Sequence, residues 1–205
     1  GNSVSLSSDG TIMAVGAPLA HIGGDANTGY VEVYQYNGSS WSLVGARLNG
    51  TVDSLYGGSV NLSSDGTILA VGAYKYDNDY TGYVEVYQYN GSSWSRLGPR
   101  LNGEAANNSF GHKVSLSSDG TILAVGAMAA DINGSASGSV YIYQYNGSAW
   151  SDFPELPNNG NRLNGKAAGN SFGYEVSLSS DGTILAVGAP YADINGSNSG
   201  SVYIY

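Results

Sequence analysis

The sequence predicts an all-β protein of about four consecutive units, each built from four antiparallel strands, and three observations lead to this prediction. A segment close to VSLSSDGTILAVGA occurs four times, starting at Val4, Val60, Val114 and Val176. Its turn aspartates, Asp9, Asp65, Asp119 and Asp181, recur every 54 to 62 residues, a spacing typical of one supersecondary unit in a repeat protein. Apolar residues alternate with a period of two, and no stretch has the period of a helix.

The third copy shows the expected strands most completely. Alternating residues from Val114 predict a first strand, and the Asp119-Gly120 turn joins it to a second, fully buried strand over 122–127. A longer loop, 128–138, then leads to a third strand over 139–145. This third strand places Val and Ile on one face and Tyr on the other, so we expect both of its faces to be covered.

A second hairpin completes the unit. Asn146-Gly147 is a strong turn signal, and it leads to a weaker fourth strand around Trp150. Repeated four-stranded units that are buried on both faces are typical of blades packed around an axis, so the sequence predicts a partial β-propeller. The main alternatives explain less: a β-solenoid has shorter coils without two tight hairpins, and a sandwich does not account for near-identical copies.

Composition narrows the function. The chain of 205 residues carries a net charge of −9, which argues against nucleic acid as a partner. It has no cysteine, so no disulfide supports the fold. No apolar run approaches the roughly 20 residues of a membrane span. An acidic surface rich in Gly, Ser and Asn suits a solvated, extracellular protein or one that attracts cations.

At two motifs the chain resembles the FG-GAP repeat of integrin α-chain propellers and many secreted microbial proteins. Phe110-Gly111 and Phe172-Gly173 precede first strands, and Val-Gly-Ala-Pro occurs over 15–18 and 187–190. The resemblance covers essentially the whole chain and implies a propeller. In the second copy Tyr56-Gly57 replaces Phe-Gly, and Tyr74 and Met128 stand where the other copies have proline. The Asp-rich calcium loop of integrin-type repeats is replaced by Ser-Ser-Asp-Gly-Thr, so that calcium site is not expected. The first hairpin also resembles a WD40 blade, without the Trp-Asp ending.

One face of the predicted disc carries the long connections. The first-to-second and third-to-fourth turns are minimal, whereas the second-to-third loops are long, over 19–29, 74–82, 128–138 and 191–200. Because binding function usually lies in long loops held by a rigid scaffold, we expect a protein or glycan partner on this long-loop face. Three of these loops carry an aspartate at an equivalent position, and the first carries His21: Asp77, Asp131 and Asp193.

Two of these loops have alternating oxygen ligands. Asp131 with Asn133, and Asp193 with Asn195, match what a hard cation such as calcium prefers. The alternative is an Asx turn that needs no metal, and we favour it because each loop supplies only two such side chains. Calcium is thus a possible cofactor here, and no other cofactor is expected.

Other repeated residues have structural explanations. The four turn aspartates are explained by the hairpin, and the tyrosine rows by packing between blades rather than by carbohydrate stacking. The three tryptophans, Trp41, Trp94 and Trp150, recur on the outer strand. Only two histidines occur, His21 and His112, and no nucleophile–base arrangement is visible. We therefore expect no enzymatic activity. Carboxylates across the axis would support a hydrolase or lyase, whereas an axis lined by the Ile-Leu-Ala-Val strands would exclude it.

N-glycosylation acceptor patterns are frequent. They occur at Asn37, Asn49, Asn61, Asn90, Asn107, Asn133, Asn146 and Asn195. Asn-Gly-Ser is also good turn chemistry, but Asn49, Asn61 and Asn107 lie outside the hairpin position. Asn61 lies on a first strand and is expected to be the hardest to modify, so the other seven are the glycosylation candidates.

These observations lead to one interpretation with two alternatives. We expect a secreted or cell-surface, non-catalytic propeller module with a structural or adhesive role; the alternatives are an intracellular WD40-like scaffold and a propeller hydrolase or lyase. Repeats are expected over residues 1–56, 57–110, 111–172 and 173–205, the last incomplete. An incomplete ring predicts that further blades of the same chain, or a second copy, close it.

Overall fold

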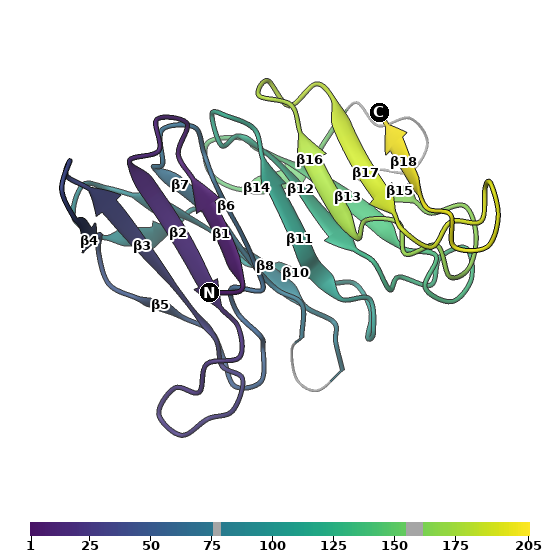
Figure 1. Cartoon of the computed structure of the whole chain (residues 1–205), viewed down its shortest axis with the longest axis horizontal. Helices are drawn as coiled ribbons and strands as arrows, with labels where there is room; N and C mark the ends of the chain where they lie inside the picture. Colours follow the sequence, from purple (N-terminus) through teal and green to yellow (C-terminus); the bar gives the residue numbers. More distant parts are fainter. Residues whose placement is uncertain (76–78, 155–161) are drawn as a thin grey trace.

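The computed structural model describes residues 1–75, 79–154 and 162–205, and it consists of four antiparallel sheets that we call blades 1 to 4 (Figure 1). Blade 1 contains β1 (Ser3–Leu6), β2 (Ile12–Ala17), β3 (Tyr30–Tyr36), β4 (Trp41–Leu43) and β5 (Leu48–Asn49). Blade 2 contains β6 (Ser59–Leu62), β7 (Ile68–Ala73), β8 (Tyr83–Tyr89), β9 (Trp94–Arg96) and β10 (Leu101–Asn102). Blade 3 contains β11 (Phe110–Leu116), β12 (Ile122–Ala127), β13 (Ser139–Tyr145), β14 (Trp150–Asp152) and β15 (Arg162–Asn164). Blade 4 contains β16 (Glu175–Leu178), β17 (Leu185–Ala189) and β18 (Ser201–Ile204).

The predicted all-β class and the order of strands within each unit are confirmed. The described residues form no helix, and so none of them belongs to a helix that is long and apolar enough to cross a membrane. The Asp-Gly hairpins form as expected: Asp119 Oδ1 accepts hydrogen bonds from Ser117 Oγ (2.6 Å) and the Thr121 backbone (3.0 Å), and Gly120 has a φ of 70°. The turn explanation of the aspartates therefore holds.

The fourth strand differs from the sequence prediction, because it is interrupted. In blades 1 to 3 two short strands pair with different ends of the same third strand, β4 and β5 with β3 for example. The break in blade 1 lies at Gly45, whose φ is 72°. A side chain there would meet the Trp94 ring of the next blade at 2.9 Å, and Trp94 Nε1 donates to the Val44 carbonyl (3.0 Å). The interruption thus lets the tryptophan of one blade lock onto the outer strand of its neighbour.

Two glycines let neighbouring blades approach each other. The carbonyl of Gly111, from the Phe-Gly pair of blade 3, lies against the Cα of Gly72 on β7, where an added Cβ would be 2.1 Å from the carbonyl oxygen. The same contact occurs between Gly16 and Gly57 and between Gly126 and Gly173. The glycines of both motifs are therefore explained by one close backbone contact that no larger residue permits.

Apolar side chains fill the space between the blades. Phe110 is buried between blades 2 and 3, and its ring is 5.2 Å from that of Tyr141 in an edge-on arrangement. Val140 and Ile142, on the other face of the same strand, pack in the cluster that includes Phe172. The expectation that the tyrosine rows pack between blades is confirmed for Tyr141, which is 1 % exposed.

Blade 2 contains a buried polar network in addition to packing between the Tyr56 and Tyr83 rings, whose centroids are 6.2 Å apart. Tyr56 Oη donates to Tyr87 Oη (2.9 Å), and Tyr87 Oη donates to Glu85. The carboxylate of Glu85 also pairs with Arg96 (3.0 Å) and Arg100 (3.1 Å). Position 56 has tyrosine rather than phenylalanine because the tyrosine hydroxyl is the first donor in this chain of hydrogen bonds. Burial of Tyr56, the largest effect, and its tyrosine and glutamate neighbours raise the pKa of its hydroxyl.

The innermost strands β1, β6, β11 and β16 are joined by side chains at one repeat position. The Leu62 backbone donates to Ser5 Oγ (3.0 Å), the Leu116 backbone to Asn61 Oδ1 (2.7 Å), and the Leu178 backbone to Ser115 Oγ (3.0 Å). These bonds hold the first strand of each blade against that of the next, so the four first strands line the axis.

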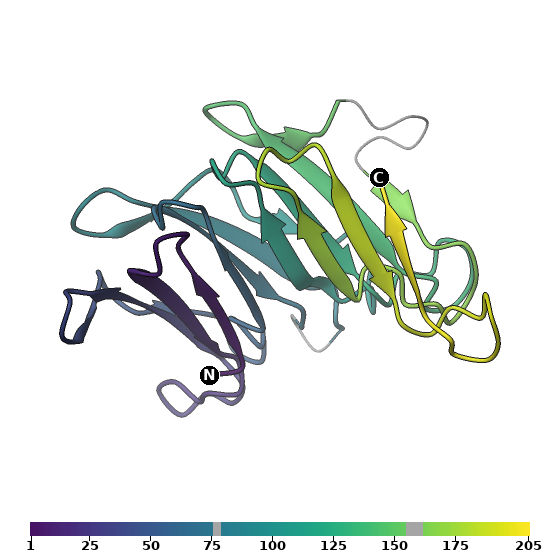
Figure 2. The same cartoon turned by 45° about the horizontal axis from the view of Figure 1, so that its top comes forward.

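The long and short connections lie at opposite ends of the strands (Figures 1 and 2). The Asp-Gly turns lie toward the upper edge in Figure 1, whereas the loop over 18–29 extends at the lower edge and those over 128–138 and 190–200 at the right-hand side. The structure thus has a tight-turn face and a long-loop face. Residues 76–78 of the second long loop, including Asp77, lie outside the described residues.

Acid is expected to weaken the hairpin turns. Hydrogen bonds from Ser179, first, and from Thr183 lower the pKa of Asp181 to about 2, and those from Ser7 and Thr11 lower that of Asp9. A carboxylate whose folded-state pKa is depressed contributes stability that is present above its unfolded pKa and is lost as the pH falls through the folded value. Thermal midpoints should therefore fall between pH 4 and pH 2. A variant with all four turn aspartates changed to Asn keeps an acceptor oxygen without titrating, so parallel pH curves for the two proteins would contradict this explanation.

Candidate functional site

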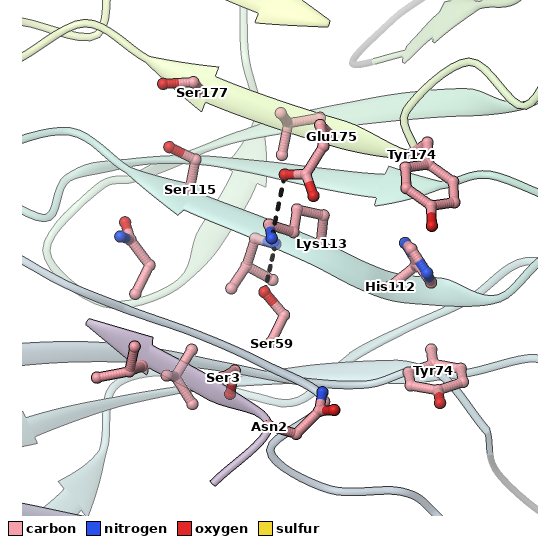
Figure 3. A pocket seen from close by; sticks show the side chains of 16 residues that line it. Asn2, Ser3, Ser59, Tyr74, His112, Lys113, Ser115, Tyr174, Glu175 and Ser177 are labelled. Atoms are coloured by element: carbon pink, nitrogen blue, oxygen red, sulfur yellow. Dashed lines mark hydrogen bonds and ion pairs between the residues drawn. The ribbon is translucent and has the colours of Figure 1, made fainter. Parts of the chain in front are cut away.

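A cavity of about 490 Å³ lies on the axis at the long-loop end of the four first strands. Its walls are the inner strands, and its mouth is formed by residues at or next to the ends of strands (Figure 3). The Ile-Leu-Ala-Val strands do not line the cavity, so the axis is not the apolar one that would exclude a hydrolase or lyase. Those strands are second in each blade and are covered by the first strands, whose hydroxyl-rich face points to the axis instead.

Three aromatic rings form one side of the mouth. His112 lies between Tyr74 and Tyr174, with ring centroids 5.6 Å and 5.1 Å away, respectively. Figure 3 shows the three side chains in a row, coming from three different blades. Tyr74 follows β7, His112 lies in β11, and Tyr174 precedes β16. We call these three residues the aromatic row.

A charge pair crosses the cavity beside the aromatic row. Lys113 Nζ lies 3.0 Å from Glu175 Oε2, and both side chains are partly exposed. Because a partly exposed pair of this kind is screened by water, it contributes little to stability. Its effect on the cavity is to cancel the two formal charges at the mouth.

His112 is poised to be neutral near pH 7. Burial lowers the pKa of its imidazole, and this effect outweighs the opposing hydrogen bond to the Tyr174 backbone and the charge of Glu175. Its Nδ1 atom is buried without a hydrogen-bond partner among the described residues. The ring therefore packs mainly as an aromatic surface.

Several cavity residues differ between the near-identical repeats. The position of His112 is Asn2, Gly58 and Tyr174 in the other copies, and the next position is Ser3, Ser59, Lys113 or Glu175. Tyr74 stands where two other copies have proline. The sequence alone does not bring these positions together, because only the fold places the end of β7 beside the start of β11. Their shared departure from the repeat was the available signal.

The opposite end of the axis is different. A smaller hollow of about 270 Å³ there is lined mainly by serines and leucines, including Ser8, Ser64, Ser118 and Ser180. Backbone bonds of 2.8 Å link these four serines from blade to blade. This tight-turn end has no aromatic or charged residue in its lining, so the long-loop end is the better candidate site.

The predicted cation loops lie on the long-loop face, away from the axial cavity. Asp131 Oδ1 accepts the Ala136 backbone N–H (2.7 Å), and Asp193 Oδ1 accepts that of Asn198 (2.6 Å). Asn133 Nδ2 donates to the Gly165 carbonyl (2.8 Å), and the Asn195 backbone donates to Ser199 Oγ (3.1 Å). Within the described ranges no three acidic, His or Cys side chains gather as a metal site would require. Calcium binding by these loops stays a prediction.

The glycosylation candidates occupy distinct environments. Asn37, Asn90 and Asn146 are exposed at hairpin tips, where each side-chain oxygen accepts hydrogen bonds from its own turn. Asn49 lies at the end of β5, and Asn107, Asn133 and Asn195 lie in exposed connections. Asn61, by contrast, is held on β6 by its bonds to Leu116 and Ser5. Modification of the candidates stays a prediction.

Blades packed face to face, first strands on the axis and a cavity at one end define a β-propeller-type repeat protein. Residues 102–143 and 164–205 match the FG-GAP repeat. The chain thus contains FG-GAP repeats at two positions, and the recognition made from the Phe-Gly and Gly-Ala-Pro motifs is confirmed there. No curated protein is significantly similar to the chain in sequence.

Solved structures confirm the propeller fold. The chain resembles the periplasmic gluconolactonase of Pseudomonas aeruginosa (16% identity, TM-score 0.61), over 94% of this chain and 51% of that one. It also resembles Chaetomium thermophilum Sqt1, solved with the N-terminus of ribosomal protein L10 (17% identity, TM-score 0.56), over 99% and 44%. A putative 6-phosphogluconolactonase from Bacteroides fragilis is similar over 74% and 37% (13% identity, TM-score 0.52). The chain spans about half or less of these propellers, and the likeness is one of fold alone.

Proposed function

We propose that this chain is part of a non-catalytic, extracellular or cell-surface propeller that recognises a protein or glycan through its long-loop face. The observation that carries the proposal is the set of apolar side chains exposed on the long connections between strands and between blades. Leu19, Val52, Tyr80, Ile132 and Ile194 are 40% to 69% exposed. Exposed apolar side chains on long loops held by a rigid scaffold are typical of interaction surfaces.

The chemistry of the cavity supports binding rather than catalysis. Its single carboxylate, Glu175, is paired with Lys113, whereas a hydrolase or lyase of the kind considered would place several carboxylates at the axis. His112 has two tyrosines as ring neighbours. We infer that the gluconolactonase-like fold is used here without that enzyme's chemistry.

The test compares the two faces of the disc. The chain is immobilised and exposed to purified matrix proteins, cell-surface ectodomains and a glycan array. We expect at least one saturable interaction that is weakened about tenfold or more by Ile132→Asp with Ile194→Asp, because charges in an apolar contact are poorly solvated. The matched control is Gln88→Asp, an exposed position on the outer part of blade 2 near the tight turn.

Two results would overturn the proposal. One is an interaction weakened by Gln88→Asp and not by the loop variant, which would place recognition on the other face and favour a scaffold of the WD40 type. The other is turnover of a sugar lactone or glycan that Glu175→Gln abolishes, which would favour the hydrolase or lyase.

The proposed secretory location predicts which asparagines carry glycans. In protein from its natural source, or from a eukaryotic secretory host, we expect occupancy at the hairpin tips Asn37, Asn90 and Asn146, because these side chains are exposed. Asn61 should stay unmodified, because its amide is engaged between two inner strands. Glycopeptide mass spectrometry measures both. An occupied Asn61, or empty tips in a secretory host, would contradict the prediction.

The proposal includes a partner for the open blade faces, either further blades of the same chain or a second copy. Val4 is 64% exposed, whereas its equivalents Val60, Val114 and Val176 are at most 7% exposed. On blade 4, Val202 is 70% exposed, whereas Val31, Val84 and Val140 at that position are fully buried. The two faces are opposite halves of the interface that joins blades.

The open faces make a prediction for the isolated 205-residue chain. It should self-associate with increasing concentration in analytical ultracentrifugation, and Val202→Asp should abolish the association, because it puts a charge into the apolar contact. The control is Gln35→Asp, which introduces the same charge at an exposed position. A chain that stays monomeric at every concentration would exclude the second copy and leave further blades as the partner.

A further inference from the structure

We propose that the axial cavity binds one neutral sugar unit, such as the end of a glycan, with its ring against Tyr74, His112 and Tyr174. The inference rests on the proposed recognition by the long-loop face and names the ligand class for the cavity at its centre. Three features of the cavity carry it: the aromatic row, the free hydroxyl donors and the cancelled charge.

The aromatic row supplies an apolar wall in a polar cavity. Its rings come from three blades and lie within 5.6 Å of their neighbours, so the wall is continuous at the mouth. A sugar ring has an apolar face of C–H groups and a rim of hydroxyls. Tyrosine offers an apolar body with a polar tip and matches such a ligand better than a wholly apolar one.

Two serines of the inner strands supply hydroxyl donors that have no acceptor among the described residues. Ser59 Oγ accepts the Val114 backbone N–H (3.1 Å), and Ser115 Oγ accepts that of Leu178 (3.0 Å). A serine hydroxyl that accepts one bond still has its own proton to donate. Both hydroxyls are therefore fixed in position by the blades and able to donate to a ligand in the cavity.

The charge of the mouth favours a neutral ligand. A sugar without ionised groups leaves the Lys113–Glu175 pair intact. Its hydroxyls can still form hydrogen bonds with the other N–H groups of Lys113 and the other carboxylate oxygen of Glu175. An anion or cation would compete with one member of the pair and leave the other unmatched. Glu175 and Lys113 are the only formal charges in the lining. The volume, about 490 Å³, lies in the range of roughly 300–1,000 Å³ that small-molecule sites occupy.

The hollow at the other end of the axis lacks the aromatic row, and this difference supports the inference. The hollow at the tight-turn end also has serines but has no aromatic residue in its lining. Hydroxyls alone are satisfied as well by water as by a sugar, so they give no preference. The aromatic row is what distinguishes the long-loop end, and its removal is the decisive test.

The experiment titrates the 205-residue chain with neutral monosaccharides and short neutral glycans by isothermal calorimetry. We expect at least one to bind with a stoichiometry of one per chain. Tyr174→Ala should weaken this binding at least about fivefold, since an aromatic contact contributes on the order of 1 kcal/mol beyond its area. Tyr191→Ala removes an exposed tyrosine of the same face outside the cavity and should leave affinity unchanged. Circular dichroism melts confirm that both variants fold.

Salt separates neutral from charged ligands. Binding of a neutral sugar should be the same at 0.1 M and 0.5 M NaCl, because no net charge is screened. Three results would overturn the inference: no neutral saccharide binds, the bound one is insensitive to Tyr174→Ala, or only charged saccharides, amino acids or peptides bind, with strong salt dependence. If one of these results is obtained while a protein partner still depends on Ile132 and Ile194, the sugar inference fails and the proposed function stands. If neither experiment shows binding at this face, both fail.

Discussion

Replacing Gly72 by alanine is expected to destabilise the protein by about 3 kcal/mol or more, the upper end of the cost of overpacking. The new Cβ would lie 2.1 Å from the Gly111 carbonyl oxygen. This neighbour is backbone, held by its own blade, and cannot rotate away as a side chain would. The two blades must therefore separate along the whole contact, or the strand must shift. Equilibrium denaturation measures the loss, which corresponds to a fall of roughly 10 °C in the thermal midpoint for a chain of this size.

The repeat supplies the control for this substitution. Gly188 occupies the same position in blade 4, where an added Cβ meets nothing nearer than the Glu175 side chain at 3.3 Å. Gly188→Ala changes the same residue in the same strand without a facing blade, and should cost less than about 1 kcal/mol. Equal losses in the two variants would show that the strand, rather than the contact between blades, requires glycine.

Much of the fold is predictable because each repeat contains the same local sequence signals for turns and strands. The Asp-Gly and Asn-Gly turns, the two-period third strands and the fully buried second strands are all local features. The interruption of the fourth strand was not predicted, because it depends on Trp94 of the next blade reaching Val44. The Tyr56-Gly57 variant of the motif likewise has its reason in Glu85 and Tyr87, about 30 residues further along the chain.

The candidate site was less predictable than the fold. The long-loop face follows from connection lengths, and the structure places the axial cavity at that end. The aromatic row does not follow, because Tyr74 and His112 come from different repeats and opposite ends of neighbouring strands. In a repeat protein, positions where copies disagree are a better guide to a site than positions where they agree, since agreement is already required by packing.

Replacing Glu85 by alanine is expected to cost about 3 kcal/mol, within the range for removing one member of a buried ion pair. The carboxylate is only 4% exposed and contacts Arg96, Arg100 and Tyr87. Its loss leaves the Tyr87 hydroxyl, and through it that of Tyr56, without the acceptor that ends the chain of bonds. Arg96 is 48% exposed and can turn to water, which keeps the cost below that of a fully enclosed pair.

Glu32 occupies the position of Glu85 in blade 1. Comparing the two alanine variants distinguishes the effect of burying the carboxylate from the effect of its hydrogen bonds and ion pair. It makes the same kinds of contact, with Arg47 (2.7 Å) and the Tyr34 hydroxyl (2.7 Å), but its side chain is 15% exposed and Arg47 is 44% exposed. Glu32→Ala should therefore cost only about 1 kcal/mol. Chemical denaturation of the two variants tests this directly. If both losses are small and equal, the network of blade 2 is not held by its burial, and the choice of tyrosine at position 56 has no energetic basis in it.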